Sequence, residues 1–138
     1  MTARAVRVER GLNATTHEVW DALTAPEQLA GWLGRGVLEP FVGGRVDLIT
    51  AGPGGGRVVG AVRQYDPPQV LELTWRFENE LETVLRIELQ PGGGKTLLRL
   101  SHTDLPAELH HEYQQGWSQY ADALARQVGA QREAHGAT

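Results

Sequence analysis

Four consecutive residues, Ser101-His102-Thr103-Asp104, contain the three side-chain types of a hydrolase triad. Such a triad needs a serine hydroxyl that hydrogen-bonds to an imidazole, which a carboxylate orients in turn. The alternating apolar pattern before this segment predicts a strand, and successive side chains of a strand point to opposite faces. Ser101 therefore points away from His102, and a local serine triad is excluded.

His102 and Asp104 share one face of that strand, so the carboxylate could orient the imidazole and raise its basicity. In an enzyme built on this pair, His102 would be the base, Asp104 its orienting partner and Tyr113 the acid. The alternative is a structural histidine whose ring bonds to a backbone carbonyl at the end of the strand. We favour this alternative, so no catalytic residue is expected.

Three residues with metal-binding side chains, His110, His111 and Glu112, lie next to one another. Neighbouring residues of a helix diverge by about 100° and cannot hold one ion together, unlike a pair four residues apart. The chain has no cysteine, which excludes thiolate nucleophiles and zinc–cysteine sites. We expect neither a metal nor a cofactor.

The segment 91–96, Pro-Gly-Gly-Gly-Lys-Thr, ends like a phosphate-binding loop. That motif also requires a glycine five residues before Gly94, where this chain has Leu89, and it must open a helix. Residues 97–102 continue as a strand instead. The segment is therefore predicted to be a hairpin turn, and nucleotide binding is not expected.

Between residues 37 and 103, apolar side chains recur at every second position, which is the period of a strand buried on one face. Charges of both signs interleave on the opposite face, which indicates a solvated surface. The charged residues in question are Glu72, Arg76, Arg86, Glu88 and Arg99. The pattern predicts a one-sided antiparallel sheet.

Helical signals flank this sheet. A capping box over residues 15–18 opens a short helix, and residues 24–27 open a second one that should end at Gly34. A first strand is expected over residues 3–12. From Ala107 to about residue 129, apolar and aromatic side chains recur at helical spacing, so one long helix is predicted after Pro106. This helix must cover the apolar face of the sheet.

The chain has 138 residues, 41% of them hydrophobic and 22% charged, which suits one globular domain. Thirteen Lys and Arg against seventeen Asp and Glu give a net charge of −4 without a basic cluster. Neither nucleic acid nor an anionic membrane is therefore an expected partner. No apolar run approaches the roughly 20 residues of a membrane span, and the first residues lack a signal peptide's apolar run. We expect a cytoplasmic protein, either a monomer or a homodimer.

Several short motifs occur in a characteristic order between about Val6 and Val128. They are Thr16 to Trp20, Leu23 to Glu27, Trp32, Gly43-Gly44, Asp66 to Pro68, Leu73 to Trp75, Thr96 to His102 and Gly116-Trp117. In this the chain resembles the START-like (SRPBCC) superfamily with the birch-pollen-allergen fold. It is most similar to the bacterial branch named after the activator of the heat-shock-chaperone ATPase.

The resemblance implies a helix-grip fold of the α+β class. A curved antiparallel sheet of about six to seven strands would wrap around the long C-terminal helix, with two short helices after the first strand. Residues 1–138 would form a single START-like domain, with an ordered core of about residues 4–129.

The resemblance also implies a cavity between the sheet and the last helix. The many large aromatic side chains agree with this, because apolar pockets with a few polar groups are typical ligand sites. The residues expected to line the cavity are Trp32, Trp75, Phe77, Leu85, Leu98, Leu100, His102, Tyr113, Trp117 and Tyr120. Arg45, Arg57 or Arg63 could reach a ligand carboxylate there. The alternative is a tightly filled core without a cavity.

The function expected from this architecture is the binding of a small hydrophobic or amphipathic ligand. Two alternatives stay open. One is an enzyme of the cyclase, dehydratase or hydrolase type that acts on polyketide-like substrates in the same cavity. The other is a regulator of a chaperone ATPase, as the family name suggests. Substrate turnover would distinguish the first alternative, and co-purification with a chaperone would test the second.

Overall fold

The computed structural model describes residues 5–52 and 55–136, and side chains up to residue 131. In this part of the chain, seven strands form one antiparallel sheet in the order β1-β7-β6-β5-β4-β3-β2. The strands are β1 (Val6–Leu12), β2 (Gly34–Leu38), β3 (Arg45–Thr50), β4 (Arg57–Asp66), β5 (Val70–Phe77), β6 (Thr83–Gly92) and β7 (Lys95–Thr103). The helical elements are α1 (Thr16–Thr24), α2 (Pro26–Leu29), the 3-10 turn η1 (Ala107–Leu109) and α3 (His110–Gly136). The predicted helix-grip fold of the α+β class is confirmed.

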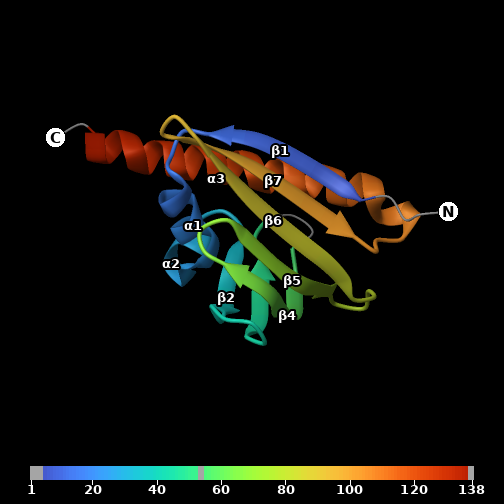
Figure 1. Cartoon of the computed structure of the whole chain (residues 1–138). Helices are drawn as coiled ribbons and strands as arrows, with labels where there is room; N and C mark the ends of the chain where they lie inside the picture. Colours follow the sequence, from blue (N-terminus) through green and yellow to red (C-terminus); the bar gives the residue numbers. More distant parts are fainter. Residues whose placement is uncertain (1–4, 53–54, 137–138) are drawn as a thin grey trace.

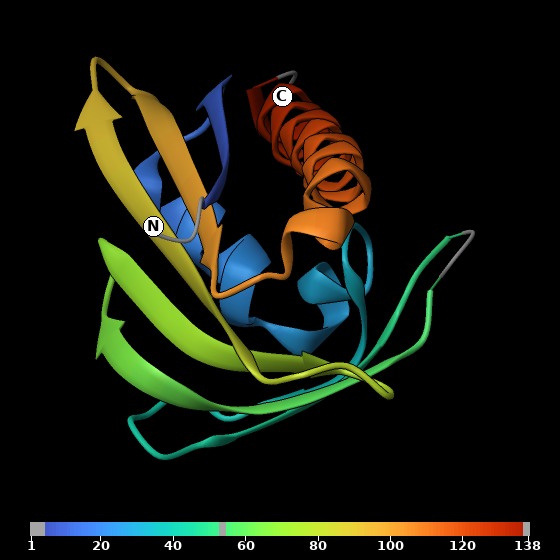
Figure 2. The ribbon, with the colours of Figure 1, turned by 90° about the vertical axis from the view of Figure 1, so that its right-hand side faces the viewer.

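The sheet curves around the helices. Figure 1 shows α3 running behind β1 and β7, and Figure 2 shows it nearly end on, inside the arc of the sheet with α1 and α2. The buried positions of β6 and β7 alternate with partly exposed ones, as the period of two predicts. The apolar face of the sheet and the inner faces of the helices form one hydrophobic core. No helix of the described residues is both long and apolar enough to cross a bilayer.

The first helix begins where the capping box predicts it. The side chain of Thr15 accepts from the backbone nitrogen of Glu18, and the Glu18 carboxylate accepts from the backbone nitrogen of Thr15. The second helix is shorter than expected, because it ends at Leu29 and not at Gly34. Residues 30–33 form turns instead, and the Trp32 indole donates to the carbonyl oxygen of Ala22 at 2.7 Å, which packs this turn against α1.

The outer face of the sheet carries the predicted charges. Arg86 pairs with Glu72 at 3.2 Å and with Glu88 at 2.8 Å, and Arg99 pairs with Glu9 on the neighbouring strand at 3.1 Å. These partly or largely exposed pairs contribute little stability each, so their main effect is to keep this face solvated.

The glycine-rich segment near Lys95 is the predicted hairpin between β6 and β7, with Gly92 paired to Lys95. Gly93 and Gly94 have φ angles of 61° and 81°, which only glycine adopts readily. The chain then continues as β7, so the helix that a phosphate-binding loop requires does not follow.

Two expected boundaries differ from the structure or fall outside it. The last helix continues to Gly136, past its expected end near residue 129, because the following residues are mostly good helix formers without a proline. The expected start of the first strand at residue 3 and of the ordered core at residue 4 lie outside the described residues.

Candidate functional site

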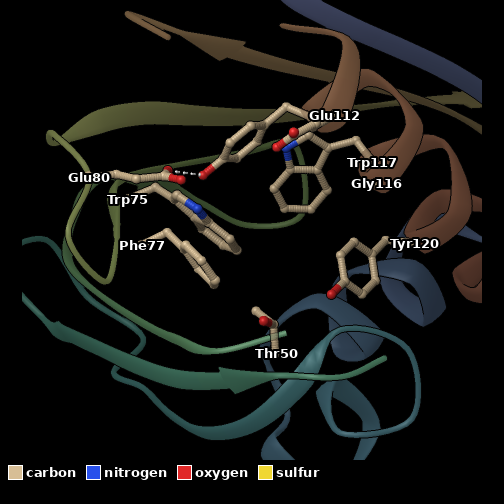
Figure 3. A pocket seen from close by; sticks show the side chains of 9 residues that line it. Thr50, Trp75, Phe77, Glu80, Glu112, Gly116, Trp117 and Tyr120 are labelled. Carbon is tan, nitrogen blue, oxygen red and sulfur yellow. Dashed lines mark hydrogen bonds between the residues drawn. The ribbon is translucent and has the colours of Figure 1, made fainter. Parts of the chain in front are cut away.

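A cavity of about 240 Å³ lies between the end of β5 and the first half of α3. Its wall comprises Thr50 from β3, Trp75 and Phe77 from β5, Glu80 from the β5–β6 loop, and Glu112, Tyr113, Gly116, Trp117 and Tyr120 from α3. Figure 3 shows Trp75 and Phe77 facing Trp117 and Tyr120 across the space, with Thr50 at one end. The side chains of sheet and helix therefore do not fill the whole space between them.

Spacing along the chain explains how these side chains meet. Glu112, Gly116 and Tyr120 lie four residues apart and share one face of α3. Trp75 and Phe77 lie two residues apart and point to the same side of β5. Trp75 and Thr83 are the last residues that pair between β5 and β6. The chain leaves the sheet after Phe77 and forms the loop that contains Glu80.

Behind the aromatic wall, His102 is completely buried and both of its ring nitrogens are bonded. The Trp117 indole nitrogen donates to Nδ1 at 2.8 Å, and because an indole nitrogen can only donate, the ring proton is assigned to Nε2. Nε2 then donates to Thr83 Oγ1 at 2.6 Å, and that hydroxyl donates to the carbonyl oxygen of Trp75 at 2.7 Å. This chain of bonds holds both tryptophans of the wall in place.

The pair of His102 and Asp104 that the enzyme alternative requires is not formed. Both nitrogens of His102 are occupied by Thr83 and Trp117, and Asp104 is exposed at a φ of 69° after the end of β7. Burial lowers the pKa of His102 from 6.5 to about 3, so the ring is neutral at physiological pH. The bond to a backbone carbonyl that the sequence favoured is not formed either, because both partners of His102 are side chains.

Of the three residues assigned to catalysis in the enzyme alternative, only Tyr113 lines the cavity. Its hydroxyl donates to Glu80 Oε1 at 2.6 Å, which ties α3 to the β5–β6 loop (dashed in Figure 3). Burial raises the pKa of Tyr113, and the hydrogen bond to Glu80 and its charge raise it further, so the phenol stays protonated at neutral pH.

The Trp75 indole N–H is a buried donor at the same corner. Trp75 is 4% exposed, and its nitrogen lies near the Tyr113 hydroxyl, where it opposes the rise in the pKa of that group. It nevertheless has no partner at hydrogen-bonding geometry among the described residues. Buried donors without a partner are rare, and they often mark the place of a water or a ligand.

The other tyrosine and the threonine of the wall are already bonded. The Tyr120 hydroxyl donates to the carbonyl oxygen of Ala51 at 2.7 Å. Thr50 Oγ1 accepts from the backbone nitrogen of Gly56 at 2.9 Å. These bonded groups form the end of the cavity beside Thr50. The polar groups that a ligand could still reach lie at the other end, which Glu80 and Glu112 form.

The ten residues expected to line the cavity divide into two groups. Five of them are in its wall, namely Trp75, Phe77, Tyr113, Trp117 and Tyr120. The other five, Trp32, Leu85, Leu98, Leu100 and His102, are buried in the core and do not line it.

None of the three arginines considered for a ligand carboxylate lines the cavity. Arg57 pairs with Asp47 at 2.9 Å, Arg63 lies 3.6 Å from Glu72, and Arg45 is exposed.

Four residues of the wall were not predicted from the sequence, namely Thr50, Glu80, Glu112 and Gly116. The four-residue spacing of Glu112, Gly116 and Tyr120 is a signal that was available. Glu80 lies in a loop, where no periodic pattern reveals which way a side chain points. No three His, Asp or Glu side chains of the described residues are grouped so that they could hold a metal ion.

Solved structures share this fold. Protein MLL2253 from Mesorhizobium loti is 25% identical to this chain, with a TM-score of 0.83 over 92% of this chain and 98% of that one. CalU16 from Micromonospora echinospora is 25% identical, with a TM-score of 0.76 over 89% and 73%. The Aha1 dimer from Colwellia psychrerythraea, 15% identical with a TM-score of 0.76 over 91% and 96%, shows the likeness of fold alone.

No curated protein matches the sequence. Residues 13–129 match the family model described as Activator of Hsp90 ATPase homolog 1-like protein. This match covers most of the chain and agrees with the resemblance that the motifs from Thr16 to Trp117 indicate. The chain belongs to the Activator of Hsp90 ATPase homolog 1-like family of the SRPBCC superfamily.

Proposed function

We propose that this protein binds a small amphipathic molecule in the cavity between β5 and α3. A cavity of about 240 Å³ opens beside a closely packed core, so the sheet and α3 do not close completely over each other here. Five aromatic residues and a few polar groups form its wall, which is the usual composition of a small-molecule site. The size and lining suit a ligand with a short apolar body.

The observation that carries the proposal is Gly116. A glycine inside a helix costs about 1 kcal/mol relative to alanine, so an unexplained glycine is unfavourable there. A Cβ atom at this position would meet no atom within 4 Å, so packing does not exclude a larger side chain. The space beside Gly116 belongs to the cavity, and a ligand gives a reason for keeping it open.

The Trp75 indole adds a polar requirement. Its unpartnered N–H would be satisfied by an acceptor atom on the ligand, which removes the cost of a buried unbonded donor. We therefore expect the ligand to combine its apolar body with an oxygen or nitrogen acceptor at the Glu80 end of the cavity.

Two glycines of α3 provide a matched test. Gly129 lies on the same helix, and a Cβ atom there would also have no atom within 4 Å, but Gly129 does not line the cavity. We expect the wild type and Gly129→Leu to bind an environment-sensitive apolar dye with one-to-one stoichiometry, measured by fluorescence titration. Gly116→Leu should lose this binding while it keeps its resistance to urea, because its Cβ meets no atom within 4 Å and the rest of the side chain would extend into the cavity.

Equal dye binding by both leucine variants would contradict the proposal, because the dye would then bind elsewhere. A severe loss of stability in Gly116→Leu alone would indicate that the space beside this glycine is needed by neighbouring side chains rather than by a ligand. Gly116→Ala is the milder companion variant, and it should raise the stability of the helix and weaken dye binding only slightly.

A further inference from the structure

The charged groups of the cavity wall are all acidic. Among its nine residues, Glu80 and Glu112 carry carboxylates, and there is no lysine, arginine or histidine. The remaining polar side chains of the wall, apart from the Trp75 indole, already have hydrogen-bond partners. A ligand that enters this cavity therefore meets negative charge that nothing in the wall compensates.

Both carboxylates act on the same corner of the cavity. Glu80 accepts the Tyr113 hydroxyl at 2.6 Å, and Glu112 precedes Tyr113 in the first turn of α3. Glu80, Glu112 and Tyr113 line the cavity together, and the charges of both glutamates raise the pKa of Tyr113. In Figure 3 the two glutamates lie at the end of the pocket opposite Thr50.

The rest of the wall also favours a cation. The aromatic rings of Trp75, Phe77, Tyr113, Trp117 and Tyr120 surround the space, and the faces of such rings attract ammonium groups. A carboxylate ligand would lose its hydration and be repelled by Glu80 and Glu112, and among the described residues of the wall the Trp75 N–H is the one free side-chain donor that could offset this cost. Cationic and anionic amphipathic ligands would fit the apolar part of the cavity equally well. The charge of the ligand should therefore decide which of them binds.

The Trp75 N–H points to a ligand independently of the acidic groups. It is a donor at the same corner, buried and without a partner among the described residues, and an ammonium group cannot accept from it. A ligand that satisfies the whole corner needs a donor or positive charge for the two glutamates and an acceptor for Trp75. An amine with a neighbouring hydroxyl or ether oxygen provides both.

We propose that the cavity selects an amphipathic organic cation, an amine with a short apolar tail and an oxygen acceptor beside the charged nitrogen. This inference rests on the proposed binding function and adds the chemical class of the ligand. It predicts discrimination by charge among ligands that share one tail.

Three probes with the same octyl tail isolate the charge. N-octylethanolamine is cationic, ethylene glycol monooctyl ether is neutral and octyloxyacetate is anionic, and each carries an oxygen acceptor near the same position. Binding is measured by isothermal titration calorimetry on the full chain. We expect the cation to bind about tenfold more tightly than the neutral ether, the range given by one cation–π contact and one partly exposed ion pair, and the anion to bind more weakly than the ether.

The double variant Glu80→Gln/Glu112→Gln removes both charges and keeps an acceptor oxygen for the Tyr113 hydroxyl. Its preference for the cation over the ether should disappear, while its affinity for the ether remains. Glu9→Gln/Glu88→Gln is the charge-matched control, because Glu9 pairs with Arg99 and Glu88 with Arg86 on the outer face of the sheet. This control should keep the wild-type preference, which should weaken as the salt concentration rises.

The outcomes separate this inference from the proposed function. If all three probes bind the wild type equally, the cavity binds ligands but does not select cations, and only the inference is overturned. Tighter binding of the anion, or a cation preference that survives in the double variant, also overturns it. If none of the probes binds, the proposed function fails as well.

Discussion

The imidazole of His102 connects its own strand, β7, to β6, β5 and α3, because each of its ring nitrogens is bonded inside the core. Through Thr83 it reaches the backbone of β5, and through Trp117 it reaches α3. The ring can do this only in its neutral form, since a second proton would take the lone pair that accepts from Trp117. The same contacts therefore position the cavity wall and occupy both ring nitrogens of His102.

This burial predicts that acid destabilises the protein through His102. The folded-state pKa is about 3 and the ordinary value is 6.5, so between these pH values the unfolded chain binds a proton that the folded chain does not. The free energy of unfolding should therefore fall by up to about 1.4 kcal/mol per pH unit as the pH drops below 6.5, and it should gain no such slope above 6.5. The neighbouring ring of Tyr113 stays protonated throughout because its pKa is raised.

The variant His102→Gln isolates this effect, because glutamine keeps a donor and an acceptor but does not titrate. Urea unfolding should show the wild type to be more stable at about pH 7, and this advantage should shrink by about 2 kcal/mol at about pH 5. Parallel pH dependences of the two proteins would show that His102 is protonated as readily in the folded state as in the unfolded chain.

Strand alternation is sufficient to put His102 on the inner, apolar face of the sheet, and in the structure the buried ring bonds there to Thr83. It is not sufficient to name Trp117 as the second partner, because that contact depends on how α3 is rotated over the sheet. The same rotation decides which aromatic residues face the cavity. Residues such as Leu98 and Leu100 have the inward orientation that was predicted, yet they lie in the filled part of the core.

At the scale of elements, periodic patterns predicted the long strands and helices better than their ends. The capping box placed the start of α1 correctly because its two hydrogen bonds are local. The predicted end of the second helix was wrong because the turn after Leu29 is stabilised by a tertiary contact, the bond from the Trp32 indole to α1. The β5–β6 loop with Glu80 has no periodic pattern, and its position depends on its bond to α3.

The capping box itself can be tested by mutation. Thr15→Ala removes the hydroxyl that accepts from the backbone of Glu18 and should lower the free energy of unfolding by about 1 kcal/mol. Thr16→Ala is the matched control at the first position of the same helix, and its effect should stay within about 0.5 kcal/mol, as for an ordinary surface substitution. Equal losses in both variants, measured by urea unfolding, would show that the cap does not stabilise α1.

At the scale of the whole molecule, three side-chain hydrogen bonds hold α3 in place beside the cavity. The bonds from Tyr113 to Glu80, from Tyr120 to Ala51 and from Trp117 to His102 connect α3 to the β5–β6 loop, to the residue after β3 and to β7. From charge and composition, neither nucleic acid nor an anionic membrane was an expected partner. These properties could not reveal that Glu80 and Glu112 line the same cavity, because only the fold brings them to one wall.

A ligand that contacts both β5 and α3 should therefore stabilise the entire fold. A compound that binds only the folded state adds about 2.7 kcal/mol to the free energy of unfolding at a concentration about one hundred times its Kd. N-octylethanolamine at such a concentration should raise the melting temperature of the wild type and of Gly129→Leu, measured by differential scanning calorimetry. It should leave Gly116→Leu unchanged, because the leucine side chain would take up space that the ligand needs.

ATP with magnesium is the comparison ligand for this experiment. The segment Gly94-Lys95-Thr96 forms part of the β6–β7 hairpin, so the backbone nitrogens of a helix start are not available there to hold a phosphate. ATP should therefore leave the melting temperature of all three proteins unchanged. A rise with ATP that Lys95→Ala abolishes would contradict the assignment of this segment as a turn without a ligand. A rise with N-octylethanolamine that is equal in Gly116→Leu would place its binding outside the cavity.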